Sequence, residues 1–548
     1  MRYRPLALAA VLVLSLCSGG AVTATAAEPT TDTAAEGNAT LVEAYPNPVA
    51  DGDRGEFVTV HFDYPANTTG WTLGDGTTSV RLPNRTFRGP VVFSSTPRAA
   101  RNHTETRVVE LDSRLRLANG GEQLALRADE ATVDTARYRD APESRIRSFR
   151  TGTWRPVGAT DIDPISARES EVTAFTLPDS PKQVVETLRG ADDRLLLGGY
   201  TLTSERVTDV LVDAHERGVT VRVLLDGSPV GGMSERQAEQ LTRLSEAGVD
   251  VRLLDGPHVR YAHHHPKYAV VDDRALVLTE NFKPAGTGGM SSRGWGVVLS
   301  DAELAAALAD LHAADRTWRA ATPWSTYRRG RDFVAADPAV GDFETRHHPK
   351  QVTVDAATLL VAPDNAASAV ERRIDSAETR LLVQQVEIDS RENRLLRAAL
   401  RAAERGVRVR IQLSSGWYVK EDNAALVEWL NRRADAEGWD LDARVDDPDG
   451  YGKIHTKGVI VDDTAILGSL NWGRTALTEN REVAVALEGE GVADYYAGVF
   501  DDDWSGSNRR KTPAGLFGVA AVAIAGALLF ARRIQFRGRD GVVTDWQW

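Results

Sequence analysis

Apolar residues along this chain follow two different periods, and the change between them divides the sequence into an all-β part and a longer mixed part. From about residue 39 to 140, short runs of β-branched and aromatic residues are separated by turn residues such as those at 74–76 and 119–121. Six or seven such runs in about 100 residues predict a β-sandwich. Residues 151–160, which contain two glycines and a proline, are predicted to form a linker.

Beyond the linker, strand-like apolar runs alternate with amphipathic helical stretches, and the same pattern occurs twice. The run 194–200 matches the run 380–386, and the helix that follows ends in Glu-Arg-Gly in both copies. We expect Ser204 and Ser390 to be the N-caps of these helices, and Gly218 and Gly406 to be left-handed C-caps. Apolar strands between helices predict an α/β fold with a parallel-type sheet that is covered on both faces. Two copies of one fold are therefore expected, at residues 165–320 and 350–505, and residues 321–347 join them.

Both ends of the chain carry apolar stretches outside these domains. Residues 1–26 combine Arg2 and Arg4, an apolar run and a small-x-small site, and therefore predict a signal peptide. An uncleaved anchor helix is the alternative. Residues 514–531 are uncharged and apolar, and as a helix they would span about 27 Å. We expect a transmembrane helix there and a cytoplasmic tail at 532–548, and a buried core helix is the alternative. The predicted location is the cell membrane, with a single crossing and extracellular main domains.

The composition of the chain excludes several kinds of site and of protein. The net charge of −13 argues against a protein that coats nucleic acid. The single cysteine, Cys17, lies in the predicted signal peptide, so neither a catalytic thiol nor a thiolate metal site is expected in the mature chain. Four glycosylation sequons, all between residues 38 and 104, are typical of an exposed, secreted domain.

The candidate reactive side chains belong to a motif that occurs in both copies. In the second copy, His455 and Lys457 are followed by Asp462 and then by Gly-Ser-Leu-Asn at 468–471. The first copy places His265, Lys267, Asp272 and Asn281 at the same offsets. Alternate residues of a strand share a face, so His and Lys of each motif face the same way, and a hairpin returns the Asn to them. Lysine supplies charge for a phosphate oxygen, and Asn and Ser donate neutral hydrogen bonds. Asp272 and Asp462 are expected to be structural and to cap the hairpin turns.

This doubled pattern, His-x-Lys-x4-Asp-x6-Gly-Ser-x-Asn in its fullest form, resembles the phospholipase D superfamily from about residue 172 to 503. The resemblance implies a two-repeat α/β fold and a mechanism without metal or cofactor, in which one His forms a phosphohistidine. The other His protonates the leaving oxygen and then activates water or an alcohol. His265 is the implied nucleophile. The implied catalytic residues are His265, His455, Lys267, Lys457, Asn281, Asn471 and Glu482, and Thr279 and Ser469 are expected to bind substrate.

Two features of the site are left open by the sequence. Two imidazoles about a phosphate apart titrate as a coupled pair, so we expect one to be protonated and one neutral. The family's downstream carboxylate, which holds a His ring, is predicted to be Glu482 for the second copy. The first copy has Gly294 at the aligned place and Leu-Thr at 278–279 instead of Gly-Ser. Either another acid such as Glu280 substitutes, or the first half turns over slowly.

Other motifs have ordinary explanations. His348, Lys350 and Asp355 also satisfy the short pattern but lack the downstream Gly-Ser-x-Asn, so we interpret them as a coincidence. The three consecutive histidines at 263–265 are interpreted as a loop before the motif strand. Trp295 and Trp472 either line a substrate groove or pack in the core. The acidic run 501–503 is interpreted as a solvated helix end.

Within the predicted sandwich, residues 55–58, 70–73, 117–122 and 133–134 resemble the lamin-tail domain, an immunoglobulin-like module. This domain, assigned to residues 39–140, is expected to serve packing or adhesion. The chain as a whole is predicted to be an extracellular, membrane-anchored phosphodiesterase whose partners are its substrate and the membrane. Phospholipid is favoured as substrate because the anchor would hold the site near a bilayer. A secreted nuclease of the same superfamily and a catalytically weak adhesion or scaffold protein are the alternatives.

Overall fold

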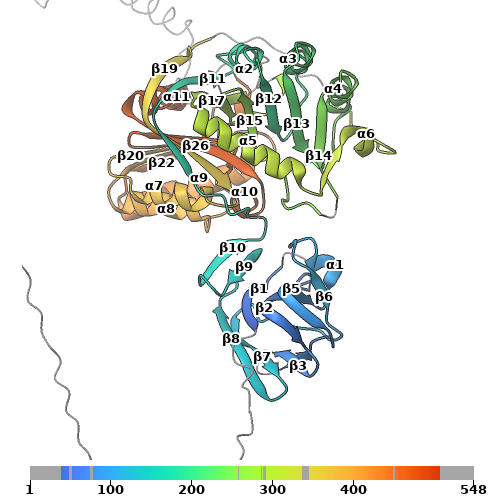
Figure 1. Ribbon diagram of the computed structural model, residues 1–548. Helices are drawn as coiled ribbons and strands as arrows, with labels where there is room; N and C mark the ends of the chain where they lie inside the picture. The colour runs from blue at the N-terminus through green and yellow to red at the C-terminus, as the bar shows by residue number, and fades with distance from the viewer. Residues whose placement is uncertain are drawn as a thin grey trace, which may run out of the picture.

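The computed structural model describes residues 39–48, 52–74, 78–256, 258–284, 287, 292–335, 345–448 and 451–506. Figure 1 shows an N-terminal β domain beneath a larger α/β body. The predicted signal peptide, transmembrane helix and tail lie outside the described residues. No helix within the described ranges combines the length and the apolar character that a membrane crossing needs.

The N-terminal domain consists of two β-sheets that enclose a common core. The larger sheet has the order β10-β9-β1-β2-β5-β6, and the smaller has the order β4-β3-β7-β8. Phe62, Phe87 and Phe93 from the larger sheet pack with Leu73 and Leu126 of the smaller one. The all-β prediction is therefore confirmed, while the likeness to a lamin tail stays a prediction. The elements are β1 Ala39–Tyr45, β2 Phe57–Asn67, β3 Trp71–Gly74, β4 Ser79–Arg81, β5 Thr86–Ser94, α1 Pro97–Ala100, β6 Val108–Glu110, β7 Gly121–Ala128, β8 Ala131–Arg139, β9 Arg145–Ser148 and β10 Thr153–Pro156.

The predicted linker at 151–160 is wrong in part, because it contains β10. This strand pairs with β9 and extends the larger sheet. Trp154 explains the pairing, since its ring packs edge-on against Tyr138 with 5.9 Å between the centroids. Burial of that aromatic surface holds the segment on the domain.

The α/β body contains the expected repeat. In the first copy the strands lie in the order β14-β13-β12-β15-β16-β17-β11, and in the second copy in the order β22-β21-β20-β24-β25-β26-β19. The first copy comprises β11 Ile165–Leu177, α2 Gln183–Arg189, β12 Arg194–Gly199, α3 Glu205–Glu216, β13 Thr220–Asp226, α4 Glu235–Glu246, β14 Asp250–Leu254, β15 Lys267–Val271, β16 Arg274–Leu278, β17 Ser292–Ser300, α5 Ala302–Thr317, β18 Ala321–Pro323 and α6 Trp324–Tyr327. The second comprises β19 Lys350–Ala362, α7 Ala366–Asp375, β20 Arg380–Gln385, α8 Arg394–Glu404, β21 Arg408–Leu413, α9 Lys420–Glu437, β22 Leu441–Val445, β23 Lys453–Ile454, β24 Gly458–Val461, β25 Thr464–Gly468, α10 Arg474–Thr478, β26 Glu482–Glu488 and α11 Glu490–Gly506.

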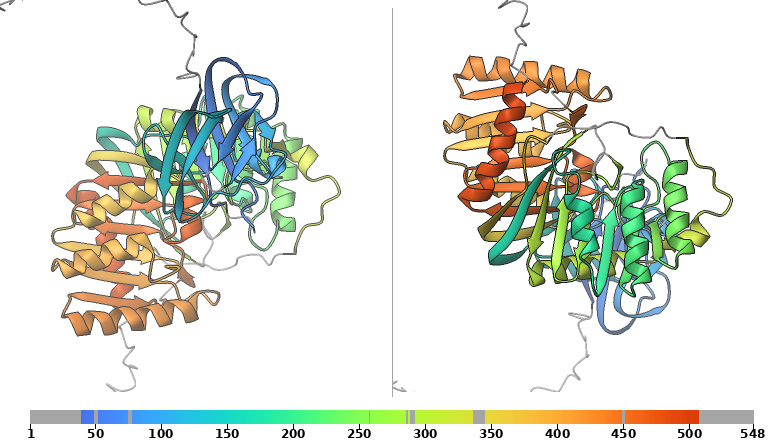
Figure 2. Two further views of the ribbon diagram at one scale, coloured as in Figure 1. Left: turned by 90° about the horizontal axis from the view of Figure 1, so that it is seen from below. Right: turned by 90° about the horizontal axis from the view of Figure 1, so that it is seen from above.

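The two copies share one continuous sheet, because β11 pairs with β19 in an antiparallel register. They lie side by side in both views of Figure 2, the first copy in green and the second in orange and red. A core shared by the copies forms where α5 and α11 cover the joined sheet. There Trp295 of the first copy stacks on Tyr496 of the second, with 4.7 Å between the ring centroids. Helices α2 to α4 and α7 to α9 belong to separate cores, one in each copy.

The sheet is mixed, so the prediction of a parallel-type sheet holds only for part of each copy. β12, β13 and β14 run parallel, as do β20, β21 and β22, but the motif hairpins and the central strands pair antiparallel. Ser204 caps α3 as expected, and Gly218 and Gly406 have positive φ. The N-cap prediction for Ser390 is wrong: α8 begins later, and the side chain of Asn393 accepts hydrogen bonds from Leu395 and Leu396.

Candidate active site

Each His-x-Lys motif leads into one strand of a hairpin, and backbone hydrogen bonds to an aspartate fix the turn. Asp272 and Asp462 occupy the two turns with φ of +53° and +49°. The Asp272 carboxylate accepts hydrogen bonds from the backbone of Asp192, Asp193 and Arg194, which lead into β12. Asp462 makes the equivalent contacts ahead of β20. These contacts fasten each hairpin to the adjacent strand, as a structural role of the two aspartates requires.

The residues just before each motif pair with the opposite copy. The backbone N–H of His265 donates to the carbonyl of Arg481 at 3.0 Å. In the same way, the N–H of His455 donates to the carbonyl of Arg293 at 2.9 Å, where β23 pairs with β17. Each copy therefore positions the histidine of the other, and the site exists only where the two copies meet.

The carboxylate that holds His265 comes from the second copy. Nδ1 of His265 lies 2.9 and 2.8 Å from the two oxygens of Glu482, whose side chain is fully buried. Asn480 donates a further hydrogen bond to this carboxylate at 3.0 Å. The prediction that Glu482 serves His455 is wrong, because the strand pairing between copies points the start of β26 at His265. A carboxylate on Nδ1 fixes the N–H there and leaves Nε2 with its lone pair.

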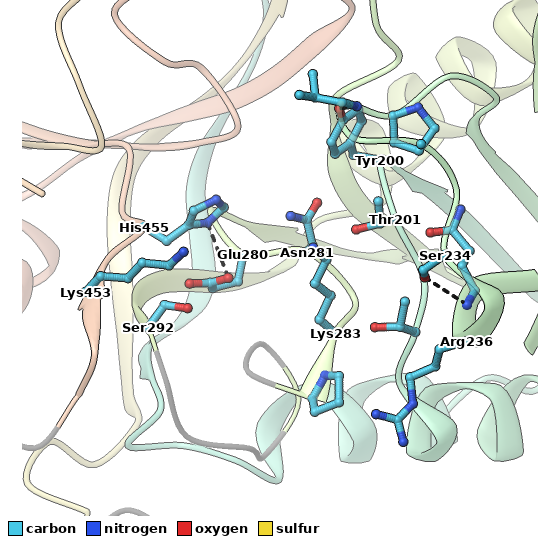
Figure 3. Close-up of a pocket in the computed structure, with 16 residues that line it drawn as sticks. Tyr200, Thr201, Ser234, Arg236, Glu280, Asn281, Lys283, Ser292, Lys453 and His455 are labelled. Carbon is cyan, nitrogen blue, oxygen red and sulfur yellow. Dashed lines mark hydrogen bonds and ion pairs between the residues drawn. The ribbon is translucent and has the colours of Figure 1, made fainter. Parts of the chain in front are cut away.

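Glu280 takes the equivalent place at His455. Its Oε2 lies 3.3 Å from Nδ1 of His455, and Figure 3 shows the two side chains facing each other beside Asn281. A Cβ added at Gly294 would overlap Cγ of Glu280, so the Glu280 side chain fills the room of the acid that this repeat position lacks. Burial alone would raise the pKa of Glu280, but His455 and Lys457 lower it to about 2. The first copy therefore does supply a carboxylate, and it serves His455. This carboxylate comes from the residues that follow β16, whereas the matching acid of the second copy, Glu482, lies at the start of β26.

Two lysines are buried between these histidines. Lys267 and Lys457 are 0% and 3% exposed. The ammonium of Lys457 donates to the carbonyl of His455 at 2.7 Å and to that of Thr279 at 3.4 Å. Burial disfavours both ammonium groups: it lowers the pKa of Lys457 to about 7 and that of Lys267 well below its ordinary value. A bound anion would favour the ammonium form of both lysines.

Both imidazoles are held neutral in the free site. Burial, opposed by Glu482, lowers the pKa of His265 to about 4. Burial and Lys457 together lower the pKa of His455 to about 4 as well. These lowered pKa values favour two neutral imidazoles in the free protein, whereas the sequence led us to expect one charged and one neutral, because burial and the neighbouring lysines disfavour charge on both rings. Each ring also responds to the lysine of the other copy, which places all four side chains in one electrostatic environment.

The side-chain oxygens of the two motif asparagines lack a hydrogen-bond partner among the described residues, whereas the hydroxyls beside them are hydrogen-bonded. The amide oxygens of Asn281 and Asn471 are buried and have no hydrogen-bond partner within the described part of the chain. In contrast, the Thr279 hydroxyl accepts from the Trp295 N–H at 2.9 Å. The Ser469 hydroxyl likewise accepts from Val483 N–H at 3.0 Å. Both hydroxyls join strands, and the substrate-binding role of Thr279 and Ser469 stays a prediction.

A cavity of about 360 Å³ opens at this cluster. His455, Glu280 and Asn281 form its inner end, and Tyr200, whose ring lies 4.8 Å from that of His265, forms part of the wall. Three cationic side chains also line the cavity, and Figure 3 shows Lys453 near His455, with Lys283 and Arg236 farther along: Arg236, Lys283 and Lys453. The cavity thus brings three cationic side chains together with an imidazole.

Two buried arginines that sequence reasoning missed hold the copies together around the site. Arg293 pairs with Asp179 and Asp503, and Arg481 pairs with Asp315 and Asp364 at 2.9 Å each. Each arginine is thereby bonded to both copies, and its carbonyl anchors a catalytic-motif histidine. The sequence does contain a signal for these arginines, because Arg293 and Arg481 occupy matching places in the repeat.

The same clusters correct the interpretation of the acidic run at 501–503. Asp503 is 7% exposed and belongs to the Arg293 cluster, so it is not a solvated helix end. A tyrosine ring lies against each guanidinium, Tyr451 at 4.7 Å from Arg293 and Tyr261 at 4.4 Å from Arg481. Aromatic cover excludes water and strengthens the ion pairs.

The remaining sequence interpretations are resolved by burial. Trp295 and Trp472 are 0% and 1% exposed and belong to the core. His348 and Lys350 are exposed, which agrees with the coincidental motif. His264 is buried and lies 3.2 Å from the carbonyl of Gly199, as part of the loop before β15. Among the described residues, no group of three His, Cys, Asp or Glu side chains is arranged to hold a metal ion.

Glu280→Gln is expected to lower kcat/KM for a diester by about 10- to 100-fold, as removal of a carboxylate that orients a functional histidine does. The neutral amide cannot stabilise the charged imidazole of His455. The steady-state hydrolysis of bis(p-nitrophenyl) phosphate would measure this.

A double variant provides the control. In Glu280→Leu/Gly294→Glu the acid returns to the repeat position that Glu482 occupies in the second copy, and Leu matches Leu470. Gly294 has no positive φ, so its backbone accepts a side chain. We expect the double variant to recover most of the activity, whereas Gly294→Glu alone, which crowds Glu280, does not. Equal activity of Glu280→Gln and wild type would show that this carboxylate has no role.

The pKa of Lys457 predicts a pH-dependent KM. Its ammonium is present below about pH 7 and is lost above it. KM for a monoanionic diester should therefore rise above pH 7, approaching about tenfold per pH unit. Bis(p-nitrophenyl) phosphate stays a monoanion from pH 6 to 9 and suits the measurement. Lys457→Gln should show a high KM with no inflection near pH 7, and a flat wild-type profile would contradict the assignment.

A protein-family model described as cardiolipin synthase, PLD-like domain, matches residues 184–318 and again 370–504, once in each copy. Among curated proteins, the mitochondrial cardiolipin hydrolase of Chlamydomonas reinhardtii is 28% identical over 100 residues, which cover 18% of this chain and 41% of that protein. The phospholipase D of Rickettsia typhi is 28% identical over 120 residues, 22% of this chain and 54% of that protein. The chain thus spans about half the length of these relatives.

Solved structures were also found to be similar. Phosphatidylserine synthase of Haemophilus influenzae Rd KW20 has a TM-score of 0.46 and 14% identity, over 61% of this chain and 86% of that one. Nuc of Salmonella typhimurium, a phospholipase D family member, has a TM-score of 0.25 and 18% identity, over 29% of this chain and 98% of that one.

Proposed function

Because the chain carries a phospholipase D-like domain twice, we propose that it is a metal-independent phosphodiesterase that acts on phospholipids through a phosphohistidine. The observation that carries the proposal is the pair of His–carboxylate contacts, His265 with Glu482 and His455 with Glu280, around two buried lysines. We further propose that the chain is exported and anchored in the cell membrane by residues 514–531, with its main domains outside.

His265 is the proposed nucleophile. The Glu482 carboxylate engages its Nδ1 with both oxygens, so Nε2 is free to attack phosphorus. The bond from phosphorus to the leaving oxygen breaks as the new P–N bond forms, and the leaving oxygen receives a proton from His455. An uncharged imidazole is a competent nucleophile, and the depressed pKa of His265 keeps it uncharged near neutral pH.

His455 acts as acid first and as base second. The negative charge of a bound diester offsets the two lysines, so its arrival raises the pKa of His455 and permits proton uptake. In the second step the neutral His455 takes a proton from water or an alcohol, whose oxygen attacks phosphorus and breaks the P–N bond. Glu280 stabilises the imidazolium in both steps, and the lysines stabilise the phosphoryl oxygens.

The substrate class is tested by comparing the activity of the protein on three substrates. Wild-type protein is incubated in EDTA with phospholipid vesicles, with plasmid DNA and with bis(p-nitrophenyl) phosphate. We expect hydrolysis of the chromogenic diester and of lipid, and no nicking of the plasmid. Nicking without lipid turnover would make the protein a nuclease. Absence of all three activities would favour the adhesion or scaffold alternative.

A further inference from the structure

Exposed apolar side chains gather at the mouth of the active-site cavity. Among the described residues, the large hydrophobic side chains that are most exposed are Tyr64, Val230, Val334, Trp417 and Tyr418. Tyr64 lies on the N-terminal domain. Val230 lines the cavity, and the other three belong to segments that contact residues of its lining: Val334, Trp417 and Tyr418. Water-exposed tryptophan and valine, 88% and 81% exposed here, cost free energy in an isolated protein, so a cluster of them beside a site indicates a contact surface.

We call the four side chains Val230, Val334, Trp417 and Tyr418 the rim. One side of the rim belongs to the first copy. Val230 follows β13 and lines the cavity itself. Val334 packs beside Gly232, another lining residue, and its N–H donates to the carbonyl of Met233 at 2.9 Å. The N–H of Val230 donates to the Tyr200 hydroxyl at 2.6 Å. Both valines are therefore held in place through their backbone N–H groups, although their side chains face solvent.

The second side belongs to the second copy and is built at the equivalent place. Trp417 and Tyr418 follow β21, which corresponds to β13 in the repeat. Lys453, which lines the cavity, lies with its ammonium 4.8 Å from the centre of the Tyr418 ring. The two loops thus flank the same opening, one from each copy.

Cations lie between these apolar loops. Arg236, Lys283 and Lys453 line the cavity inside the rim, and Figure 3 shows Lys453 and Arg236 on opposite sides of it. Apolar side chains outside a ring of cations match a surface that offers anionic headgroups above hydrocarbon. A single-stranded nucleic acid fits less well, because it needs flat rings for stacking, and the first-copy side of the opening offers only Val230 and Val334.

We infer that this rim, made of Val230, Val334, Trp417 and Tyr418, seats on a bilayer that contains anionic phospholipid, so that the cavity takes its diester from a headgroup. This inference rests on the proposed function and adds the surface by which the substrate is reached. The rim enters the interface, where tryptophan and tyrosine side chains are favoured, and the three cations bind headgroup phosphates.

The test compares membrane-borne and soluble substrates in the full chain. Trp417→Ser/Val334→Ser removes apolar surface without touching a residue that lines the cavity. We expect turnover of phosphatidylglycerol in vesicles to fall by about tenfold or more, since loss of interfacial side chains weakens adsorption. Turnover of bis(p-nitrophenyl) phosphate should remain within about twofold of wild type. Tyr64→Ser, at 67% exposure on the N-terminal domain, is the matched control and should change neither rate.

A binding measurement separates this inference from the proposed function. Wild type and Trp417→Phe are mixed with vesicles of brominated phosphatidylglycerol, and the difference in fluorescence quenching reports residue 417 alone among the 12 tryptophans. Quenching at 417 supports the rim even if no substrate is turned over, in which case only the proposed function fails. The inference would be overturned by an absence of quenching or by an unchanged vesicle rate in the double variant. It would also be overturned if the double variant, assayed with a single-stranded oligonucleotide as well, lost only the cleavage of that oligonucleotide.

Discussion

Substitution of His265 by alanine is expected to lower kcat/KM for diester hydrolysis by about 10⁴-fold or more, and substitution of His455 to lower it to a similar extent for substrates with poor leaving groups. The first change removes the atom that bonds to phosphorus, and the second removes the proton donor. His348→Ala is the matched control: it alters the exposed histidine of the coincidental motif and should leave the rate unchanged.

A substrate with a good leaving group distinguishes the two roles. p-Nitrophenolate departs without a proton, so His455→Ala should still form the phosphohistidine but release it slowly. Rapid mixing with bis(p-nitrophenyl) phosphate should then give a burst of about one equivalent of nitrophenol per protein. His265→Ala should give no burst. A phosphoryl group trapped on His455 in the His265→Ala variant would reverse the assignment.

The second large effect is expected on stability. Arg481→Met leaves Asp315 and Asp364 buried without their cation, and breaking a buried ion pair in this way costs about 3–5 kcal/mol. Burial alone would raise the pKa of Asp315, but Arg481 holds it below its ordinary value, so the intact cluster keeps this carboxylate charged. Urea denaturation followed by circular dichroism would measure the loss.

Arg474 provides the comparison for this experiment. Its side chain is 51% exposed and pairs with Glu143 and Glu479 near the surface. Arg474→Met should cost less than about 1 kcal/mol, as exposed pairs do. In Arg481→Met/Asp315→Asn/Asp364→Asn, the unpaired charges are gone and part of the stability should return. Equal costs for Arg481→Met and Arg474→Met would show that the buried cluster contributes no more than a surface pair.

The sequence by itself determined the two-repeat organisation of the α/β body and the places of its two His-x-Lys motifs. The repeat, the matching offsets of His265 and His455, and the pairing of Lys and Asn with each were all readable, because they depend on local spacing along strands and turns. The family model confirms the doubled phospholipase D-like domain. The signal peptide, the membrane helix and the lamin-tail likeness stay predictions.

Only the tertiary structure decided which carboxylate serves which histidine. Glu482 follows the second motif along the chain, yet it bonds to His265, because the segment before β15 pairs with the start of β26. Likewise, the sequence left open whether Glu280 substitutes for the acid that is missing at Gly294, and the structure places Glu280 in that space and against His455. Both facts arise from pairing between residues about 200 positions apart in sequence, and no local pattern encodes such a register.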